Sequence, residues 1–191
     1  MSTNRRTLII ACGALAHELS EVISVNNLEH IDVECLPASY HNSPEKIPDA
    51  LEERILKTST TYDQIFVGYA DCGTGGKVDE ICKKYGLTRL SGAHCYEFFA
   101  GKNNFADIQE KNIGSFYLTD FLVKHFERLV VKALWLDTHP ELENLAREAA
   151  KKLGLELIVE RNGYGDLETE IVSLLHTKKN PQLISFGTEN S

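Results

Sequence analysis

The sequence lacks any apolar run long enough to cross a membrane, and it lacks an apolar leader. A membrane-spanning helix needs about 20 consecutive apolar residues, whereas the first apolar run covers only residues 8–12. No small-residue cleavage site follows this run, so a secretory signal is not expected. These absences predict a cytoplasmic protein with no membrane partner.

Basic residues are also scarce. The 191 residues include 20 Lys and Arg against 28 Asp and Glu, a formal net charge of −8. Adjacent lysines, at residues 83–84, 151–152 and 178–179, lie near expected helix ends, where they suit the helix dipole. Binding to nucleic acid calls for a basic face, so we expect no nucleic-acid partner.

No two cysteines form a CxxC pair, and the five cysteines are an odd number. Without an export signal, the thiols are expected to be reduced and free of structural disulfides. A cysteine with a special role is therefore expected to be a metal ligand or a nucleophile.

What the sequence does contain is a regular alternation of short Val-, Ile- and Leu-rich segments with helical patterns. This alternation predicts right-handed βαβ crossovers. We therefore expect an α/β fold of Rossmann-like, three-layer form, with a mostly parallel open sheet and helices on both faces. No linker interrupts the pattern, which predicts a single domain over residues 1–191 with a loosely packed tail at 177–191. The expected strands cover residues 7–11, 31–36, 64–70, 87–90, 130–136 and 155–160.

Three of the cysteines lie at or just after the carboxyl end of an expected strand. Cys12 ends the first strand, Cys72 follows the third and Cys95 follows the fourth. Open α/β sheets bind ligands outside those strand ends, so we expect the three thiols to face one crevice. Three thiolates with one open position suit a zinc ion or an iron–sulfur cluster, with His94 or His41 as a fourth ligand. The alternatives are a single functional thiol, or small residues at crowded turns.

The other two cysteines have the pattern of core residues. Cys35 lies on the same face of a strand as Ile31 and Val33, and Cys82 lies at helical spacing from Val78. Free cysteine is among the most buried residue types. We expect both thiols to be buried and away from the three-cysteine site.

A glycine-rich segment at residues 71–76 (DCGTGG) leads from a strand into a helix. Its glycines can turn backbone N–H groups into a concavity, and the helix start adds partial positive charge. Gly73, Thr74, Gly75 and Gly76 are therefore expected to bind a small anionic molecule. The segment matches neither nucleotide-binding glycine motif, and the alternative is a tight turn that needs positive φ.

Polar side chains in the same turns are expected to move protons. His41 follows the second strand, at the same edge of the sheet as the thiols, and His94 and Glu97 flank Cys95. We expect these three groups to be catalytic and Tyr96 to contact the substrate. The alternative for His41 is a polar surface residue, and for Glu97 a helix cap or a solvated charge.

Six segments distributed along the chain together resemble the DUF1638 domain family, which has no settled activity. The resemblance implies an association with corrinoid-dependent methyl-transfer systems, and so with one-carbon metabolism, but no particular reaction. The segments are ACGAL at 11–15, YHNSPEKI at 40–47, DCGTGG at 71–76, GAHCYEFFAG at 92–101, FYLTDFL at 116–122 and GYGDLE at 163–168.

The sequence favours a metal-dependent enzyme that acts on a small anionic molecule. Its metal centre, zinc or an iron–sulfur cluster, would be held by Cys12, Cys72 and Cys95. The alternative is a metal- or ligand-binding protein, or a maturation protein, that catalyses nothing. A homo-oligomer is left open. Acid–base residues should matter to an enzyme and be dispensable in a carrier.

Overall fold

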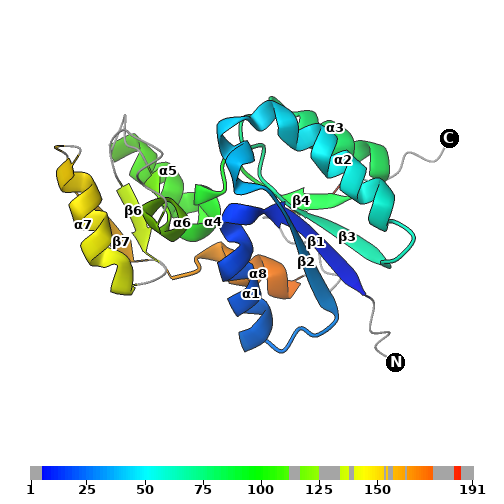
Figure 1. Cartoon of the computed structure of the whole chain (residues 1–191), viewed down its shortest axis with the longest axis horizontal. Helices are drawn as coiled ribbons and strands as arrows, with labels where there is room; N and C mark the ends of the chain where they lie inside the picture. Colours follow the sequence, from blue (N-terminus) through cyan, green and yellow to red (C-terminus); the bar gives the residue numbers. More distant parts are fainter. Residues whose placement is uncertain are drawn as a thin grey trace. The chain divides into compact units, whose positions relative to one another are not determined.

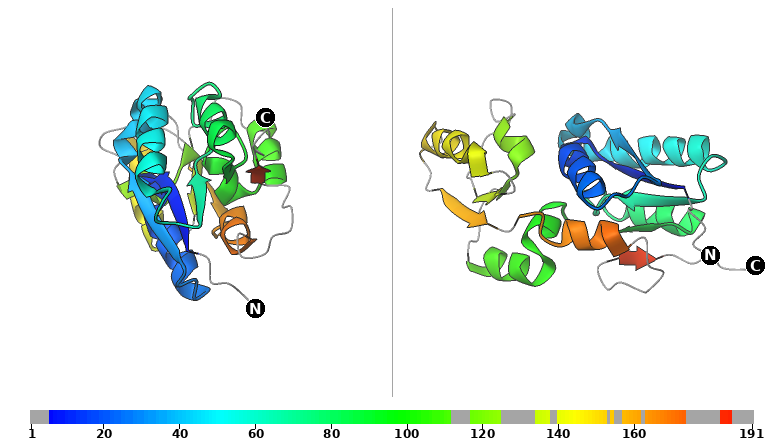
Figure 2. Two further views of the ribbon diagram at one scale, coloured as in Figure 1. Left: turned by 90° about the vertical axis from the view of Figure 1, so that its right-hand side faces the viewer. Right: turned by 90° about the horizontal axis from the view of Figure 1, so that it is seen from below.

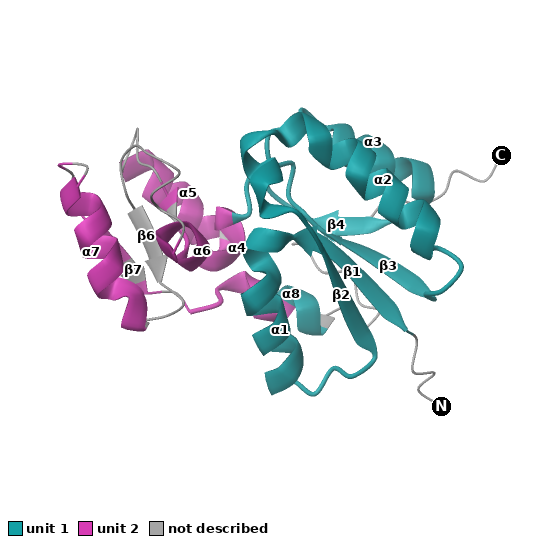
Figure 3. Cartoon of the chain, viewed as in Figure 1, with its two compact units in different colours: residues 1–95, 170–191 teal, residues 96–169 magenta. Residues whose placement is uncertain are grey.

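The computed structural model describes residues 6–111, 117–124, 134–137, 140–152, 154, 157–161, 163–173 and 183–185. The chain divides into two compact units (Figure 3): unit 1 contains Met1–Cys95 and Glu170–Ser191, and unit 2 contains Tyr96–Thr169. Compactness does not decide whether the units fold independently, so the single domain stays a prediction. Apart from residues 183–185, the expected loose tail lies outside the described residues. Over the described parts of the chain, no helix is both long and apolar enough to span a membrane.

A five-stranded sheet forms the centre of unit 1 (Figure 1). It consists of β1 (Thr7–Cys12), β2 (Ile31–Leu36), β3 (Gln64–Gly68), β4 (Thr88–Leu90) and β8 (Leu183–Ser185). The strand order is β2-β1-β3-β4-β8; the first four strands are parallel, and β8 pairs antiparallel with β4. The expected α/β fold, with a mostly parallel open sheet in Rossmann-like order, is confirmed.

Helices cover both faces of this sheet (Figures 1 and 2). α1 (Ala16–Val25) lies on one face, and α2 (Ile47–Thr58) and α3 (Lys77–Tyr85) lie on the other. Because β1 has a neighbour on each side and helices on both faces, all six of its residues are buried. Short 3-10 helices precede two of these helices: η1 (Gly13–Leu15) comes before α1, and η2 (Ala38–Asn42) and η3 (Pro44–Lys46) come before α2.

Period-two alternation directs one set of strand residues towards α2 and α3. Leu8, Ile10 and Val67 share a core with Leu51 of α2 and Cys82 of α3. Since side chains on one face of a strand recur at every second residue, the next positions on this face are those beside the carboxyl ends of the strands. This is the face on which the thiols of β1 and of the loop after β3 are found.

The two cysteines expected in the core have different environments. Cys82 is completely buried in α3, which confirms the expectation. The prediction for Cys35 is wrong, because its side chain is exposed. β2 is an edge strand, so no further strand covers its outer side. Period-two spacing gives the face of a residue, but not whether its strand lies at an edge.

Unit 2 contains a second parallel sheet in the order β5-β6-β7. The strands expected at residues 130–136 and 155–160 therefore do not join the first sheet, because alternation of strands and helices does not specify which sheet a strand enters. The strands are β5 (Tyr117–Leu118), β6 (Leu134–Asp137) and β7 (Ile158–Arg161). The helices are α4 (Tyr96–Ala100), α5 (Lys102–Lys111), α6 (Asp120–Lys124), η5 (Pro140–Leu142) and α7 (Glu143–Lys152), and α8 (Asp166–Ser173) spans the boundary between the units in sequence.

Candidate functional site

The strand order reverses between β1 and β3, and this switch point lies at the carboxyl ends of both strands. Open α/β sheets bind ligands at such a point. Ala11 is the register partner of Gly68, so the residues that follow, Cys12 and Tyr69, come next to each other on one face. A Cβ atom at Gly68 would lie 2.8 Å from that of Ala11, so glycine is what lets the two strands approach here.

Two cysteines meet beside this point. The sulfur atoms of Cys72 and Cys95 are 3.2 Å apart. Their loops are joined by two backbone hydrogen bonds: the Asp71 N–H donates to the Gly92 carbonyl at 3.2 Å, and the Cys72 N–H donates to the Ala93 carbonyl at 2.9 Å. Cys72 has a left-handed backbone, with φ 50°, which costs about 1 kcal/mol for a residue other than glycine. The surrounding loops thus hold this pair in place.

The two thiols of this pair have opposite pKa shifts. The hydrogen bond between the two thiols lowers the pKa of Cys72; burial opposes it, and backbone N–H groups of Cys95 and Ala70 add to the lowering. The pKa of Cys95 is raised well above its ordinary value by its hydrogen bond to Cys72, by burial, and by the charges of Cys72 and Cys12. The hydrogen bond therefore favours ionisation of Cys72 before Cys95, so that the first proton lost from the pair leaves its negative charge on Cys72.

Cys12 belongs to the same cluster, and its own thiol is neutral. Its side chain is 4% exposed. Burial raises its pKa from 9.0 to about 11, a hydrogen bond from the Ala14 N–H at 3.5 Å opposes this, and the charge of Cys72 raises it further. The structure therefore brings Cys12 into electrostatic contact with Cys72 and Cys95.

Tyr69 is a fourth member of this cluster that the sequence pattern did not single out. It is 1% exposed, and among the described residues its hydroxyl has no hydrogen-bond partner of acceptable geometry. Burial raises its pKa, followed by the charges of Cys12, Cys95 and Cys72 and by a contact with the Cys12 sulfur that is too poorly aligned to count as a full hydrogen bond. The signal was present in the sequence: alternation along residues 64–70 continues past the strand and places residue 69 beside Cys12.

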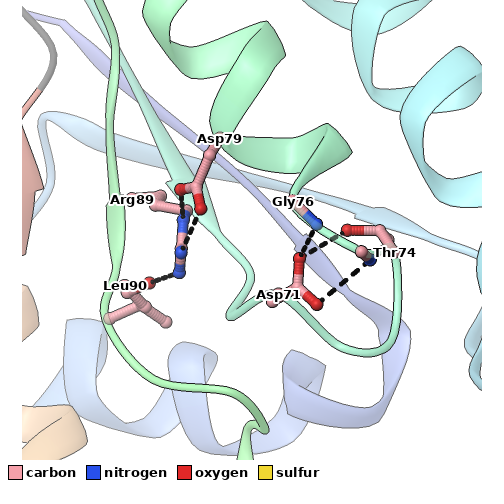
Figure 4. A network of polar contacts seen from close by, with 7 residues as sticks. Asp71, Thr74, Gly76, Asp79, Arg89 and Leu90 are labelled. Carbon is pink, nitrogen blue, oxygen red and sulfur yellow. Dashed lines mark hydrogen bonds and ion pairs between the residues drawn. The ribbon is translucent and has the colours of Figure 1, made fainter.

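The glycine loop already holds an anion of its own, the Asp71 carboxylate (Figure 4). It accepts hydrogen bonds from the Thr74 hydroxyl at 2.8 Å, the Gly76 N–H at 2.7 Å and the Gly75 N–H at 3.2 Å. Burial raises the pKa of Asp71, but these hydrogen bonds outweigh it and the net shift is downward. A substrate anion would have to displace Asp71 from these donors, and Gly73 is exposed outside this network. The binding role of the loop stays a prediction.

A buried arginine lies behind the loop. Arg89 is 4% exposed and forms an ion pair with Asp79, with one nitrogen–oxygen distance of 3.0 Å (Figure 4). It also donates to the Leu90 carbonyl. Its charge contributes to the low pKa of Asp71. The sequence pattern did not indicate this residue, because Arg89 lies inside a short apolar strand.

The two histidines expected at the site are close enough to interact. His41 lies in η2 and His94 in the turn before Cys95, and both are exposed to solvent. The atoms packed around the His41 imidazole lower its pKa, and the charge of His94 lowers it further. Their role in proton transfer stays a prediction.

Tyr96 and Glu97 belong to unit 2, where they begin α4. The Tyr96 ring stacks on that of Tyr117, with centroids 5.5 Å apart. Glu97 is half-buried in the first turn of the helix. The roles expected for both also stay predictions.

No three His, Cys, Asp or Glu side chains, among the residues that the structure describes, are arranged to hold a metal ion. Two thiolates on one tetrahedral zinc lie about 3.8 Å apart, since each Zn–S bond is about 2.3 Å. The Cys72–Cys95 sulfur distance of 3.2 Å is close to this value. As the described side chains stand, Cys12 does not complete a three-thiol metal site with this pair.

Residues 35–139 match the model of a family described as "Protein of unknown function (DUF1638)". The match covers more than half of the chain and includes Cys72 and Cys95. No curated protein and no solved structure matches the chain.

Proposed function

The chain belongs to the DUF1638 family, whose function is unknown, so we propose a function from its own side chains. In this proposal the protein is a metal-dependent enzyme that acts on a small anionic molecule. Cys12, Cys72 and Cys95 hold the metal centre. The observation that carries the proposal is the pair of sulfur atoms 3.2 Å apart, in electrostatic contact with the Cys12 thiol at the switch point of the sheet.

The electrostatics of the thiols support a cation. Burial raises the pKa of Cys12, and its hydrogen bond to Cys72 raises that of Cys95; in both cases the charge that Cys72 carries when ionised adds to the rise. A bound metal ion reverses this effect, since its positive charge stabilises thiolates that otherwise repel one another. Binding would then release protons, and metal affinity should rise with pH.

A zinc ion held by three thiolates keeps one position for substrate, and an iron–sulfur cluster with three cysteine ligands keeps one iron open. Such a centre supplies Lewis-acid activation. The chain supplies the surroundings: the lowered pKa of His41 favours the neutral imidazole, the form that accepts a proton. His94 and Glu97 are the other proposed proton carriers. The raised pKa of Tyr69 keeps its phenol protonated beside the sulfurs.

A carrier or maturation protein that holds the same metal without catalysis is the second candidate. The two candidates predict different results for His41→Ala. The variant should keep the metal in both cases, but only an enzyme should lose turnover. The one-carbon metabolism implied by the family resemblance is part of the enzyme proposal. So is a cytoplasmic location, where the thiols would stay reduced.

The test is the metal content and absorption spectrum of protein purified without oxygen. We expect close to one centre per chain, with visible absorption for an iron–sulfur cluster and none for zinc. Cys12→Ser, Cys72→Ser and Cys95→Ser should each deplete it, and combining them should add little, because the residues act as a unit. Cys35→Ser is the matched control and should keep the metal. Full metal in all three variants would refute the proposal.

A further inference from the structure

We propose that Cys72 and Cys95 of the metal-free protein form a redox-active dithiol that reduces small disulfides by thiol–disulfide exchange. This activity goes beyond the proposed function, because it needs no metal. It rests on the placement of two free cysteines from separate loops with their sulfur atoms 3.2 Å apart.

The two sulfur atoms need little movement to bond. A disulfide has a sulfur–sulfur bond of about 2.0 Å, so closure shortens the present distance by about 1 Å. The backbone hydrogen bonds from Asp71 and Cys72 to Gly92 and Ala93 fix the two loops on either side of the pair. A shift of about 1 Å is on the scale of a side-chain rotation between two loops that are already joined.

The backbone of Cys72 supports a role beyond packing. Cys72 and Asn27 are the non-glycine residues with positive φ in the described part of the chain. Asn27 lies in a turn, where such a conformation is common for asparagine. A cysteine in this conformation is strained, and strain of this kind persists where the surrounding structure imposes it, often at functional sites.

The exchange takes place in two steps that balance. The Cys72 thiolate attacks one sulfur of a small disulfide, R–S–S–R, whose S–S bond breaks; one RS⁻ leaves and takes up a proton. The Cys95 thiol then loses its proton and attacks the Cys72 sulfur, the bond from Cys72 to the second RS group breaks, and that group leaves as RSH. The pair is oxidised to a disulfide by two electrons, and one R–S–S–R is reduced to two RSH. A dithiol reductant restores the pair by the reverse chemistry.

Attack is assigned to Cys72 because it is the member of the pair whose backbone is strained. The thiolate is the nucleophile in thiol–disulfide exchange. Cys95, whose sulfur lies 3.2 Å away, is then next to the mixed disulfide and in position to resolve it.

The experiment uses full-length protein, reduced and stripped of metal with a chelator, and glutathione disulfide as the probe. Intact mass and peptide mapping should show one Cys72–Cys95 bond and two glutathione molecules released per chain. Cys95→Ser should trap a mixed disulfide on Cys72. Cys72→Ser should react at least about tenfold more slowly at Cys95, because it lacks the attacking thiolate. Cys35→Ser is the matched control and should react like the unchanged protein, and thermal melts establish that each variant is folded.

Failure to form the Cys72–Cys95 bond, with glutathione found on Cys35 alone, would overturn the proposal. Equal rates for Cys72→Ser and Cys95→Ser would overturn the role of Cys72. The metal assay is separate: a protein that forms this bond but binds no metal would refute only the proposed function. A protein that binds metal, but whose metal-free form leaves the pair reduced, would refute only the dithiol.

Discussion

Replacing Tyr69 with phenylalanine removes one oxygen atom from the middle of the thiol cluster and keeps the ring. The side chain is 1% exposed, and its hydroxyl has no hydrogen-bond partner of acceptable geometry among the described residues. A buried hydroxyl without a partner leaves a desolvation cost of about 1–3 kcal/mol uncompensated. The Cys12 thiol is near enough to offset part of this. We therefore expect Tyr69→Phe to raise the free energy of unfolding of the metal-free protein by about 1 kcal/mol, at the low end of that range.

The same change should have the opposite effect once metal is bound. The ionised Cys12 sulfur would then be an acceptor for the phenol, which keeps its proton because burial, followed by the charge of Cys12, raises the pKa of Tyr69. Loss of a hydrogen bond to a metal ligand costs about 10–100-fold in metal affinity. We expect zinc to bind Tyr69→Phe about tenfold more weakly.

Urea unfolding without oxygen and with a chelator measures the first effect, and zinc titration against a competing chelator measures the second. Tyr85→Phe is the matched control, because the Tyr85 hydroxyl donates to Glu52 at 2.8 Å. Its loss should lower stability by about 1 kcal/mol. If Tyr69→Phe lowers the stability of the metal-free protein as much as Tyr85→Phe does, the Tyr69 hydroxyl has a partner and the reasoning is wrong.

Three further predictions concern the surroundings of the cluster. Asp71→Ala should lower the free energy of unfolding, measured in urea, by about 1–2 kcal/mol, and should give the emptied glycine loop a measurable affinity for inorganic phosphate by calorimetry. No gain in phosphate affinity would show that these donors do not form an anion site. Asp79→Asn removes the charge that neutralises buried Arg89, and because Asp79 is partly exposed the expected cost is about 2 kcal/mol, less than for a fully buried pair; an unchanged midpoint would contradict this. Burial raises the pKa of Cys82 to about 12, so the thiol ionises in the unfolded state before it does in the folded state, and the stability advantage of the unchanged protein over Cys82→Ala should shrink as the pH rises from 9.0 towards 12. A difference in stability that stays constant with pH would show that the thiol is not shielded, and the control Cys35→Ala should change the free energy of unfolding by no more than about 0.5 kcal/mol.

The meeting of Cys72 and Cys95 was predictable, because parallel strands place their carboxyl ends at one edge and both residues follow such an end. The distance between their sulfurs was not, since it depends on hydrogen bonds between two loops. The part played by Asp71 was hidden for a related reason. The sequence shows donors in a glycine loop, but only the fold shows that a carboxylate one residue before Cys72 has already occupied them.

The wrong predictions come from patterns that give the face of a residue but not its neighbours in space. Alternation places Cys35 on a face of β2 that it shares with Ile31 and Val33, but β2 is an edge strand and the thiol is exposed. Tyr69 was read as the end of an apolar strand, although the same alternation brings it beside Cys12. The second sheet could not be foreseen, because pairing partners of short strands are decided by long-range packing.

The pairing of β8 with β4 fixes the order in which unit 1 can be completed during synthesis. Strands β1 to β4 come from one continuous stretch, and all three clustered cysteines lie within Met1–Cys95. β8 joins the sheet only after the residues of unit 2 have been made, since Leu90 is opposite Leu183. Until then β4 is an open edge, but it is only three residues long, and short edges are poor templates for pairing with another chain. The nascent chain can therefore assemble its thiol cluster before the sheet that carries it is closed.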